Sequence, residues 1–207
     1  IQFSEGNHSR LRPGDIKYRD LNGDGVIDDY DKMPVGFCDI PEITYGFGGA
    51  IEWKGFDVSI FFQGTARVSI FEEGSAVVPF SSGYKNNNGF LKGVMEDRWT
   101  IDNPNPNARY PRTIRPSDAL DNNNTKKSSF WVRNAAYLRL KNAEIGYTFP
   151  KRWMEKMAIQ NLRLYVSGVN LLTWAPDVRL FDPELGSGDG RKYPPTRVFN
   201  VGLNINF

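Results

Sequence analysis

The chain has 207 residues, 40% of them hydrophobic, but its longest unbroken hydrophobic run is only four residues, 135–138. This excludes a transmembrane helix, which needs about 20 such residues in succession. The 26 basic and 24 acidic residues leave a net charge of +2, too weak a field to indicate a nucleic-acid partner, and the single cysteine excludes an internal disulfide. The 20 glycines and 13 prolines are spaced like turns between short strands, which predicts a β-rich chain.

Residues 1–41 are polar and rich in turn formers, and residues 20–31 have the spacing of a twelve-residue calcium loop. Its oxygen ligands would be the side chains of Asp20, Asn22, Asp24, Asp28 and Asp31 with the backbone carbonyl of Val26, and Gly25 would supply the turn. Asp31 stands where an EF-hand has Glu, and no amphipathic helix flanks the loop. The pattern predicts a structural Ca²⁺ site; the alternative is a solvated turn, which Asp, Asn and Gly favour by themselves.

Strict alternation of hydrophobic and small or polar residues begins at Ile43 and continues to Trp53. A period of two is typical of a β-strand with one apolar face. After the short connection 54–57, Val58, Ile60 and Phe62 alternate in the same way, with Phe61 as the exception. Residues 42–54 and 56–66 are therefore predicted to form a hairpin.

Residues 67–129 interrupt the alternation with Gly, Pro and Asn clusters, apart from a short strand predicted near 68–71. Trp99 and Tyr110 in this stretch are candidate ligand-binding residues because aromatic rings stack on sugars; they could instead be loop-core or interfacial residues. Three carboxylate pairs could serve a glycosidase, but we expect them to be solvated loop acids: Glu72 and Glu73, Glu96 and Asp97, and Asp182 and Glu184. No catalytic residue is assigned, and the chain is not expected to be an enzyme.

Alternation returns in 130–149, where a change of parity near 142–143 predicts a β-bulge, and again in 161–174 and 196–207. The connections are 150–160, with one or two helical turns, and the Gly-rich loop 175–195. The predicted fold is all-β, with antiparallel up-and-down strands. When the strands are traced in order, the long connections 67–129 and 175–195 fall on one side and the short turns 54–57 and 150–160 on the other.

This asymmetry is expected of an outer-membrane barrel, with long extracellular loops and short periplasmic turns, although a sandwich could share it. Five strands cannot close a wide barrel, so the barrel interpretation makes 42–207 the C-terminal strands of a larger protein.

The order of several short motifs resembles the C-terminal part of the SusC/RagA family of TonB-linked outer-membrane transporters of Bacteroidetes. The motifs are RPGDIKY at 12–18 running into DLNGDGVID at 20–28, EITYGF at 42–47, RWT at 98–100, NPNARYP at 105–111, FWVR at 130–133, YLRLKN at 137–142, GYTFP at 146–150, LYVSG at 164–168, NLLTW at 170–174 and the strand 199–207. Together they cover nearly the whole chain.

The resemblance implies a wide barrel of about 22 strands, a plug domain and TonB-contacting segment that this chain lacks, and a place in the Gram-negative outer membrane surrounded by lipid. It implies import of oligosaccharides or other glycans, or of peptides, with a SusD-like surface lipoprotein as partner. Phe207 resembles the terminal aromatic that the barrel-assembly machinery reads. The alternative function is a secreted all-β carbohydrate-binding module stabilised by calcium.

Overall fold

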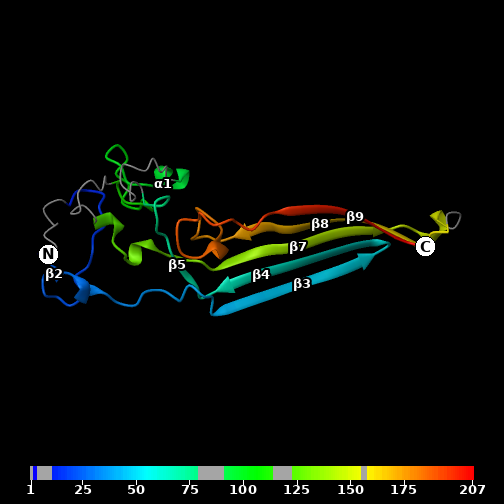
Figure 1. The fold of residues 1–207 in the computed structure, drawn as a ribbon, viewed down its shortest axis with the longest axis horizontal. Helices are drawn as coiled ribbons and strands as arrows, with labels where there is room; N and C mark the ends of the chain where they lie inside the picture. The colour runs from blue at the N-terminus through cyan, green and yellow to red at the C-terminus, as the bar shows by residue number, and fades with distance from the viewer. Residues whose placement is uncertain (1, 4–10, 79–90, 114–122, 155–157) are drawn as a thin grey trace.

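The computed structural model describes residues 2–3, 11–78, 91–113, 123–154 and 158–207. Its main feature is an antiparallel five-stranded sheet in the order β3-β4-β7-β8-β9. The strand bounds are Ile43–Trp53 (β3), Phe56–Ala66 (β4), Tyr137–Thr148 (β7), Asn161–Trp174 (β8) and Val198–Asn206 (β9). Neighbours in the sheet are also neighbours in this list, so the sheet has the predicted up-and-down order. Figure 1 shows it as a long twisted ribbon.

The predicted hairpin and bulge are both confirmed. Trp53 pairs with Phe56 across a two-residue turn, Lys54 and Gly55, whose φ angles of 49° and 89° are those of the tight hairpin turns that match strand twist. Against β4, Lys141 is the extra residue of β7, because Phe61 and Phe62 are adjacent whereas their partners Asn142 and Leu140 are two positions apart; this is one position before the expected parity change. Against β8 the extra residue lies on β8, where two residues, 170 and 171, separate the partners of Asn142 and Leu140.

The remaining elements are short. They are the two-stranded parallel pair β1 (Gln2–Phe3) and β2 (Val26–Ile27), the antiparallel pair β5 (Ser69–Phe71) and β6 (Val132–Asn134), the helix α1 (Lys92–Glu96), and the 3-10 turns η2 (Asp29–Asp31), η3 (Asn123–Thr125), η4 (Ser129–Trp131), η5 (Lys151–Trp153) and η7 (Pro183–Leu185). No helix among the described residues is long and apolar enough to cross a membrane.

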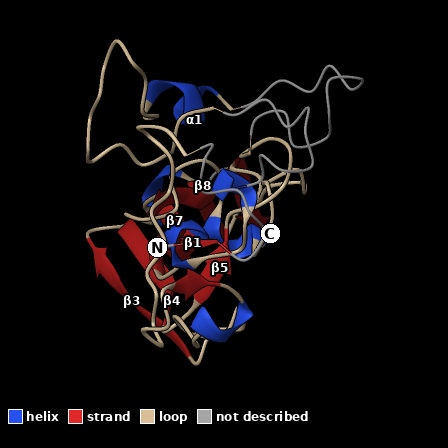
Figure 2. Ribbon diagram, turned by 90° about the vertical axis from the view of Figure 1, so that its left-hand side faces the viewer, coloured by secondary structure: helices blue, strands red, loops and turns tan. Residues whose placement is uncertain are grey.

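The described parts of 11–42, 67–136 and 175–197, which we call the loop assembly, lie at one end of the sheet. The Lys54-Gly55 turn, η5 and the C-terminus lie at the other (Figure 1). Figure 2 looks from the side of the loop assembly and shows its loops and short helices in front of the strands. The assembly has its own core, in two clusters: Ile16, Val77, Val94, Tyr110 and Trp131, and Val68, Ile70, Ala135 and Val178.

The structure divides the predicted strand 130–149 into η4, β6 and β7. Asn134 causes the break, because its side-chain oxygen accepts the Ala136 N–H at 3.0 Å and its own N–H donates to Asp177 at 2.7 Å. The N–H of buried Ala135 donates to the Val68 carbonyl at 3.0 Å. β6 therefore pairs with β5 in the loop assembly, and β7 begins anew in the sheet.

Candidate functional site: the two faces of the sheet and the loop assembly

One face of the five-stranded sheet, the apolar face, carries large hydrophobic side chains that nothing in the described chain covers. Its middle row runs across all five strands through directly paired residues: Ile51, Val58, Ile145, Val166 and Val201. Their exposed fractions run from 36% for Val58 to 75% for Val201. A surface this large and continuous indicates an interaction with an apolar environment.

Aromatic side chains border this aliphatic row on both sides. Toward the loop assembly, Phe47 stacks on Phe62 with ring centroids 5.2 Å apart, and Phe62 lies 6.4 Å from Trp174. Toward the Lys54-Gly55 turn, Phe56 lies 4.6 Å from Tyr147. An aliphatic band between two aromatic belts is typical of the outer surface of membrane barrels. The five strands are 9 to 14 residues long, which meets the need of about 9–11 residues for a membrane-spanning strand.

The opposite face of the sheet, the polar face, carries an ion-paired group near the Lys54-Gly55 turn. Arg163 on β8 donates to Asp57 on β4, with its Nε 3.0 Å from Oδ1, and to Glu144 on β7 at 2.6 Å. The group joins three neighbouring strands on the face opposite Val166. A sheet that is charged on one face and apolar on the other fits a wall between water and hydrocarbon.

A second arginine of the polar face, Arg139 on β7, anchors the connection between β8 and β9. Its side chain is 1% exposed and donates to both oxygens of Asp182, to Glu184 at 2.8 Å and to Thr173 at 2.9 Å. The Tyr137 hydroxyl also donates to Glu184. Residues 182–184 are therefore fixed to the polar face of the sheet. The expectation of a solvated loop acid is wrong for Asp182, whereas Glu184 is exposed as expected although its carboxylate is paired with Arg139.

The expectation is wrong for Glu72 as well, which is fully buried in the loop assembly. Its carboxylate accepts a hydrogen bond from Arg133 Nε at 2.8 Å and lies 3.8 Å from the guanidinium of Arg109, which in turn pairs with Asp177 at 3.1 Å. Burial raises the pKa of Glu72, and the two guanidinium groups oppose that shift. The network ties together four segments of the chain that are distant in sequence. The sequence gives little indication of this network, because adjacent acidic residues in loops usually face water.

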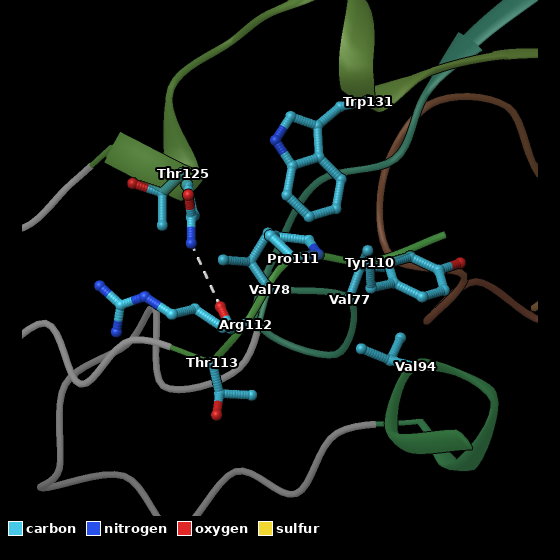
Figure 3. Close-up of a pocket in the computed structure, with 10 residues that line it drawn as sticks. Val77, Val78, Val94, Tyr110, Pro111, Arg112, Thr113, Thr125 and Trp131 are labelled. Carbon is cyan, nitrogen blue, oxygen red and sulfur yellow. Dashed lines mark hydrogen bonds between the residues drawn. The ribbon is translucent and has the colours of Figure 1, made fainter. Parts of the chain in front are cut away.

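A small cavity in the loop assembly is lined mainly by apolar side chains (Figure 3). Val77, Val94, Tyr110 and Trp131 contribute to its wall, and the Asn124 side chain closes one side by donating to the Arg112 carbonyl at 3.2 Å. Its volume of about 20 Å³ has room for one water, since about 10–15 Å³ is needed to hold one. The Trp131 indole N–H is buried and has no hydrogen-bond partner among the residues that the structure describes.

Trp99 and Tyr110, the predicted ligand-binding pair, both line a second and larger cavity of about 230 Å³, together with Gly14, Asp15 and Phe130. The backbone N–H of Trp99 donates to the backbone carbonyl of Tyr110 at 2.9 Å, which holds the two residues together. The Tyr110 side chain is only 2% exposed and is part of the assembly core, whereas Trp99 is half-buried against Gly14. Of the two rings, Trp99 is the better placed to meet a ligand.

The Asp-rich segment forms an exposed loop wound around its own carboxylates. Asp20 accepts the N–H groups of Gly23 at 2.6 Å and Gly25 at 2.8 Å, and Asp31 accepts those of Leu21 at 2.7 Å and Asp28 at 2.8 Å. The N–H groups of Asp28 and Leu21 lower the pKa of Asp31.

The predicted ligand positions thus share one closed loop, and the Asp24 carboxylate caps the Val26 N–H at 2.8 Å within it. Among the described residues, however, no three acidic, histidine or cysteine side chains converge closely enough to hold a metal ion. The fit to Ca²⁺ is therefore partial, because the oxygens are of the right type but are engaged with the backbone. Phe207, the predicted assembly signal, follows β9 at the turn end and is 79% exposed.

Comparison with known proteins places this architecture among receptors. The chain is 32% identical to TonB-dependent receptor P26 of Formosa agariphila over 94% of its length, and 31% identical to receptor P3 of the same organism. It is 24% identical to the TonB-dependent receptor SusC of Bacteroides thetaiotaomicron over 95% of its length. The chain spans only about a fifth of the length of these relatives. No family model matches it.

Solved structures of similar fold include the RagAB peptide transporter, with a TM-score of 0.64 and 22% identity over 87% of this chain and 19% of that one. The RagAB peptide importer in its open-open state gives a TM-score of 0.58 over 83% of this chain and 18% of the other. The antiparallel sheet and the loop assembly therefore have counterparts in a known importer. The relatives are named as receptors, in agreement with the expectation that the chain is not an enzyme.

Proposed function

The chain is a segment of a TonB-dependent receptor of the SusC/RagA type, and we propose that its five strands form part of the wall of a barrel of about 22 strands in the Gram-negative outer membrane. The observation that carries this proposal is the uncovered aliphatic band between two aromatic belts, on strands whose opposite face is charged. In the barrel the apolar face meets lipid, the polar face meets the lumen, and the free edges of β3 and β9 pair with strands outside this chain.

The whole receptor is proposed to import nutrients, either oligosaccharides or peptides, together with a SusD-like surface lipoprotein and with energy from TonB acting on another part of the receptor. Support comes from the names of the relatives, which are TonB-dependent receptors and a peptide importer. Under this proposal the loop assembly is extracellular, and the cavity beside Trp99 is one place where it offers an aromatic ring to a substrate. The Asp-rich loop is proposed to bind Ca²⁺ as a structural ion, with Asp20, Asn22, Asp24, Asp28, Asp31 and the Val26 carbonyl as its donors.

Two measurements on the full-length receptor test this function. Outer-membrane fractions should contain the receptor as a heat-modifiable band, because closed barrels resist unfolding until boiled. A strain without the receptor should lose uptake from one of two labelled pools, an oligosaccharide mixture or a peptide mixture, and regain it on complementation. A receptor found in soluble fractions, or unchanged uptake of both pools, would contradict the proposal.

A further inference from the structure

The outward rim of the sheet at the Lys54-Gly55 turn combines a row of aromatic rings with unpaired positive charge. Phe56, Tyr147, Phe149 and Trp153 follow one another with centroid separations of 4.6, 5.1 and 6.0 Å. Trp153 is 59% exposed, and Trp53 beside Phe56 is 66% exposed. Such rings occupy the boundary between hydrocarbon and headgroups in a membrane.

Three cations of the described residues lie at this rim: Lys54, Lys151 and Arg152. The Lys54 ammonium is 4.7 Å from the centroid of the Trp53 ring, so it lies on the apolar side of the sheet and not in the lumen. Lys151 and Arg152 in η5 are exposed, and the Gly55 carbonyl accepts the Thr148 N–H at 2.7 Å, which brings the hairpin turn beside the strand that leads to η5. None of the three forms an ion pair within the described part of the chain.

The acidic residues that the structure describes at this end lie on the other side of the sheet. Asp57 and Glu144 belong to the polar face, where both are paired with Arg163, and Glu52 is directly opposite Asp57 in the β3–β4 register. Among the described residues, the outward rim therefore carries positive charge and the polar face near the turn carries the negative charge. A ligand that meets both the rings and the cations must be apolar and anionic at once.

The backbone conformation of Lys54 suggests that its side chain has a function. Its φ of 49° lies in the left-handed region, which is costly for a residue with a Cβ, and Asn is the residue usually found at this position of the tight hairpin turn. A strained lysine at a position that Asn would fill more readily is a reason to look for a function of the side chain.

We propose that this rim binds the headgroup of an anionic glycerophospholipid. The phosphate would accept hydrogen bonds from Lys54, Lys151 and Arg152, while the acyl chains lie along the aliphatic band above Trp53 and Trp153. The inference rests on the proposed function, because it needs the apolar face to meet the inner leaflet of the outer membrane.

Native mass spectrometry of the full-length, delipidated receptor in detergent tests this directly, with phosphatidylglycerol and phosphatidylethanolamine added in turn. The rim variant carries Lys54→Asn, Lys151→Gln and Arg152→Gln, and the Asn preserves the turn. The matched control removes three exposed cations of the loop assembly, with Lys17→Gln, Lys32→Gln and Lys92→Gln. We expect the parent and the control to bind phosphatidylglycerol about tenfold more tightly than phosphatidylethanolamine, and the rim variant to lose this preference.

Equal binding of the two lipids by the parent, or an unchanged preference in the rim variant, would overturn the inference. Displacement of phosphatidylglycerol by millimolar inorganic phosphate would overturn it too, since the site would then be for a small anion. These results are distinct from failure of the proposed function, which would appear as absence of the heat-modifiable receptor from the outer membrane.

Discussion

Arg139 and Asp182 are 43 positions apart in the sequence, yet Nη2 of the arginine donates to both carboxylate oxygens of the aspartate, at 2.7 and 2.6 Å. One residue belongs to the wall of the sheet and the other to the connection between β8 and β9. The pair therefore fixes a long loop against the inner side of the wall. In the proposed barrel this loop narrows the extracellular mouth of the lumen.

Replacing Arg139 with Met is expected to release this connection. The change leaves the partly buried carboxylates of Asp182 and Glu184 without their cation, which costs about 3 kcal/mol. Trypsin cleavage after Arg179 or Arg191, measured on the full-length receptor in membranes, should become faster by tenfold or more. The control is Arg67→Met, which removes an exposed pair with Glu42 and should leave the cleavage rate unchanged. Equal cleavage in the two variants would show that Arg139 does not hold the loop.

Adjacent residues Glu72 and Glu73 allow a matched comparison of a buried and an exposed ion pair. Glu72→Gln leaves the buried Arg133 without a counter-charge and should lower the local free energy of opening of the loop assembly by about 3 kcal/mol. Glu73→Gln removes only the exposed pair with Lys127 and should cost under about 1 kcal/mol. Hydrogen exchange of the β5 and β6 amides measures both values. Similar protection in the two variants would be inconsistent with a stabilising network at Glu72.

The Ca²⁺ proposal predicts that Ca²⁺ affinity depends on Asp20, at position 1 of the loop, and not on Asp29, at position 10. Asp20→Ala should weaken Ca²⁺ binding to the full-length receptor by at least tenfold, because it removes a carboxylate ligand. Asp29→Ala removes the same charge from a residue that pairs with Lys32 on the surface and should have little effect. Calorimetric titration with Ca²⁺ gives both affinities. Equal Ca²⁺ affinity of Asp20→Ala and the parent would contradict the proposed Ca²⁺ site.

Asp31 makes the loop sensitive to acid. Its folded-state pKa is lowered by the N–H groups of Asp28, Leu21 and Asn22, so the stability it contributes is present above the unfolded pKa and is lost as the pH falls through the lowered folded value. Protection of the Leu21 and Asp28 amides, measured by hydrogen exchange without Ca²⁺ and corrected for intrinsic rates, should therefore fall below about pH 4. In Asp31→Asn the protection should be lower and independent of pH in this range. A parent loop that is equally protected at pH 3 and pH 6 would contradict this.

The strands of the sheet were predictable because each has a period of two and a face that must avoid water. Even the irregular residue has a local reason: Phe61 lies on the polar face, where Gly48 leaves it room, since a Cβ at Gly48 would come within 3.1 Å of the Phe61 ring. The glycine of β3 and the aromatic residue that breaks the alternation in β4 therefore pack against each other. In the sequence they look like two unrelated irregularities.

The loop assembly was much harder to predict, because its contacts join segments without periodicity. Glu72 and Arg133 are 61 positions apart, and Asn124 accepts the Ile16 N–H across 108 positions at 2.9 Å. Each side chain alone is typical of a solvated loop, and only the pairing makes its burial favourable. The same reason explains why Tyr110 was assigned to a ligand surface although it belongs to a core.

The central claim is that the two faces of the sheet meet lipid and lumen, and adjacent residues of β8 test it most directly. Val166 lies in the middle of the apolar face between Ile145 and Val201, and Ser167 lies on the polar face between Glu144 and Asn200. In the full-length receptor, Val166→Lys should cost about 2–4 kcal/mol of barrel stability and sharply reduce the heat-modifiable band in outer-membrane fractions. Ser167→Lys should insert like the parent. Equal insertion of the two variants, or loss of Ser167→Lys alone, would contradict the assignment of the faces.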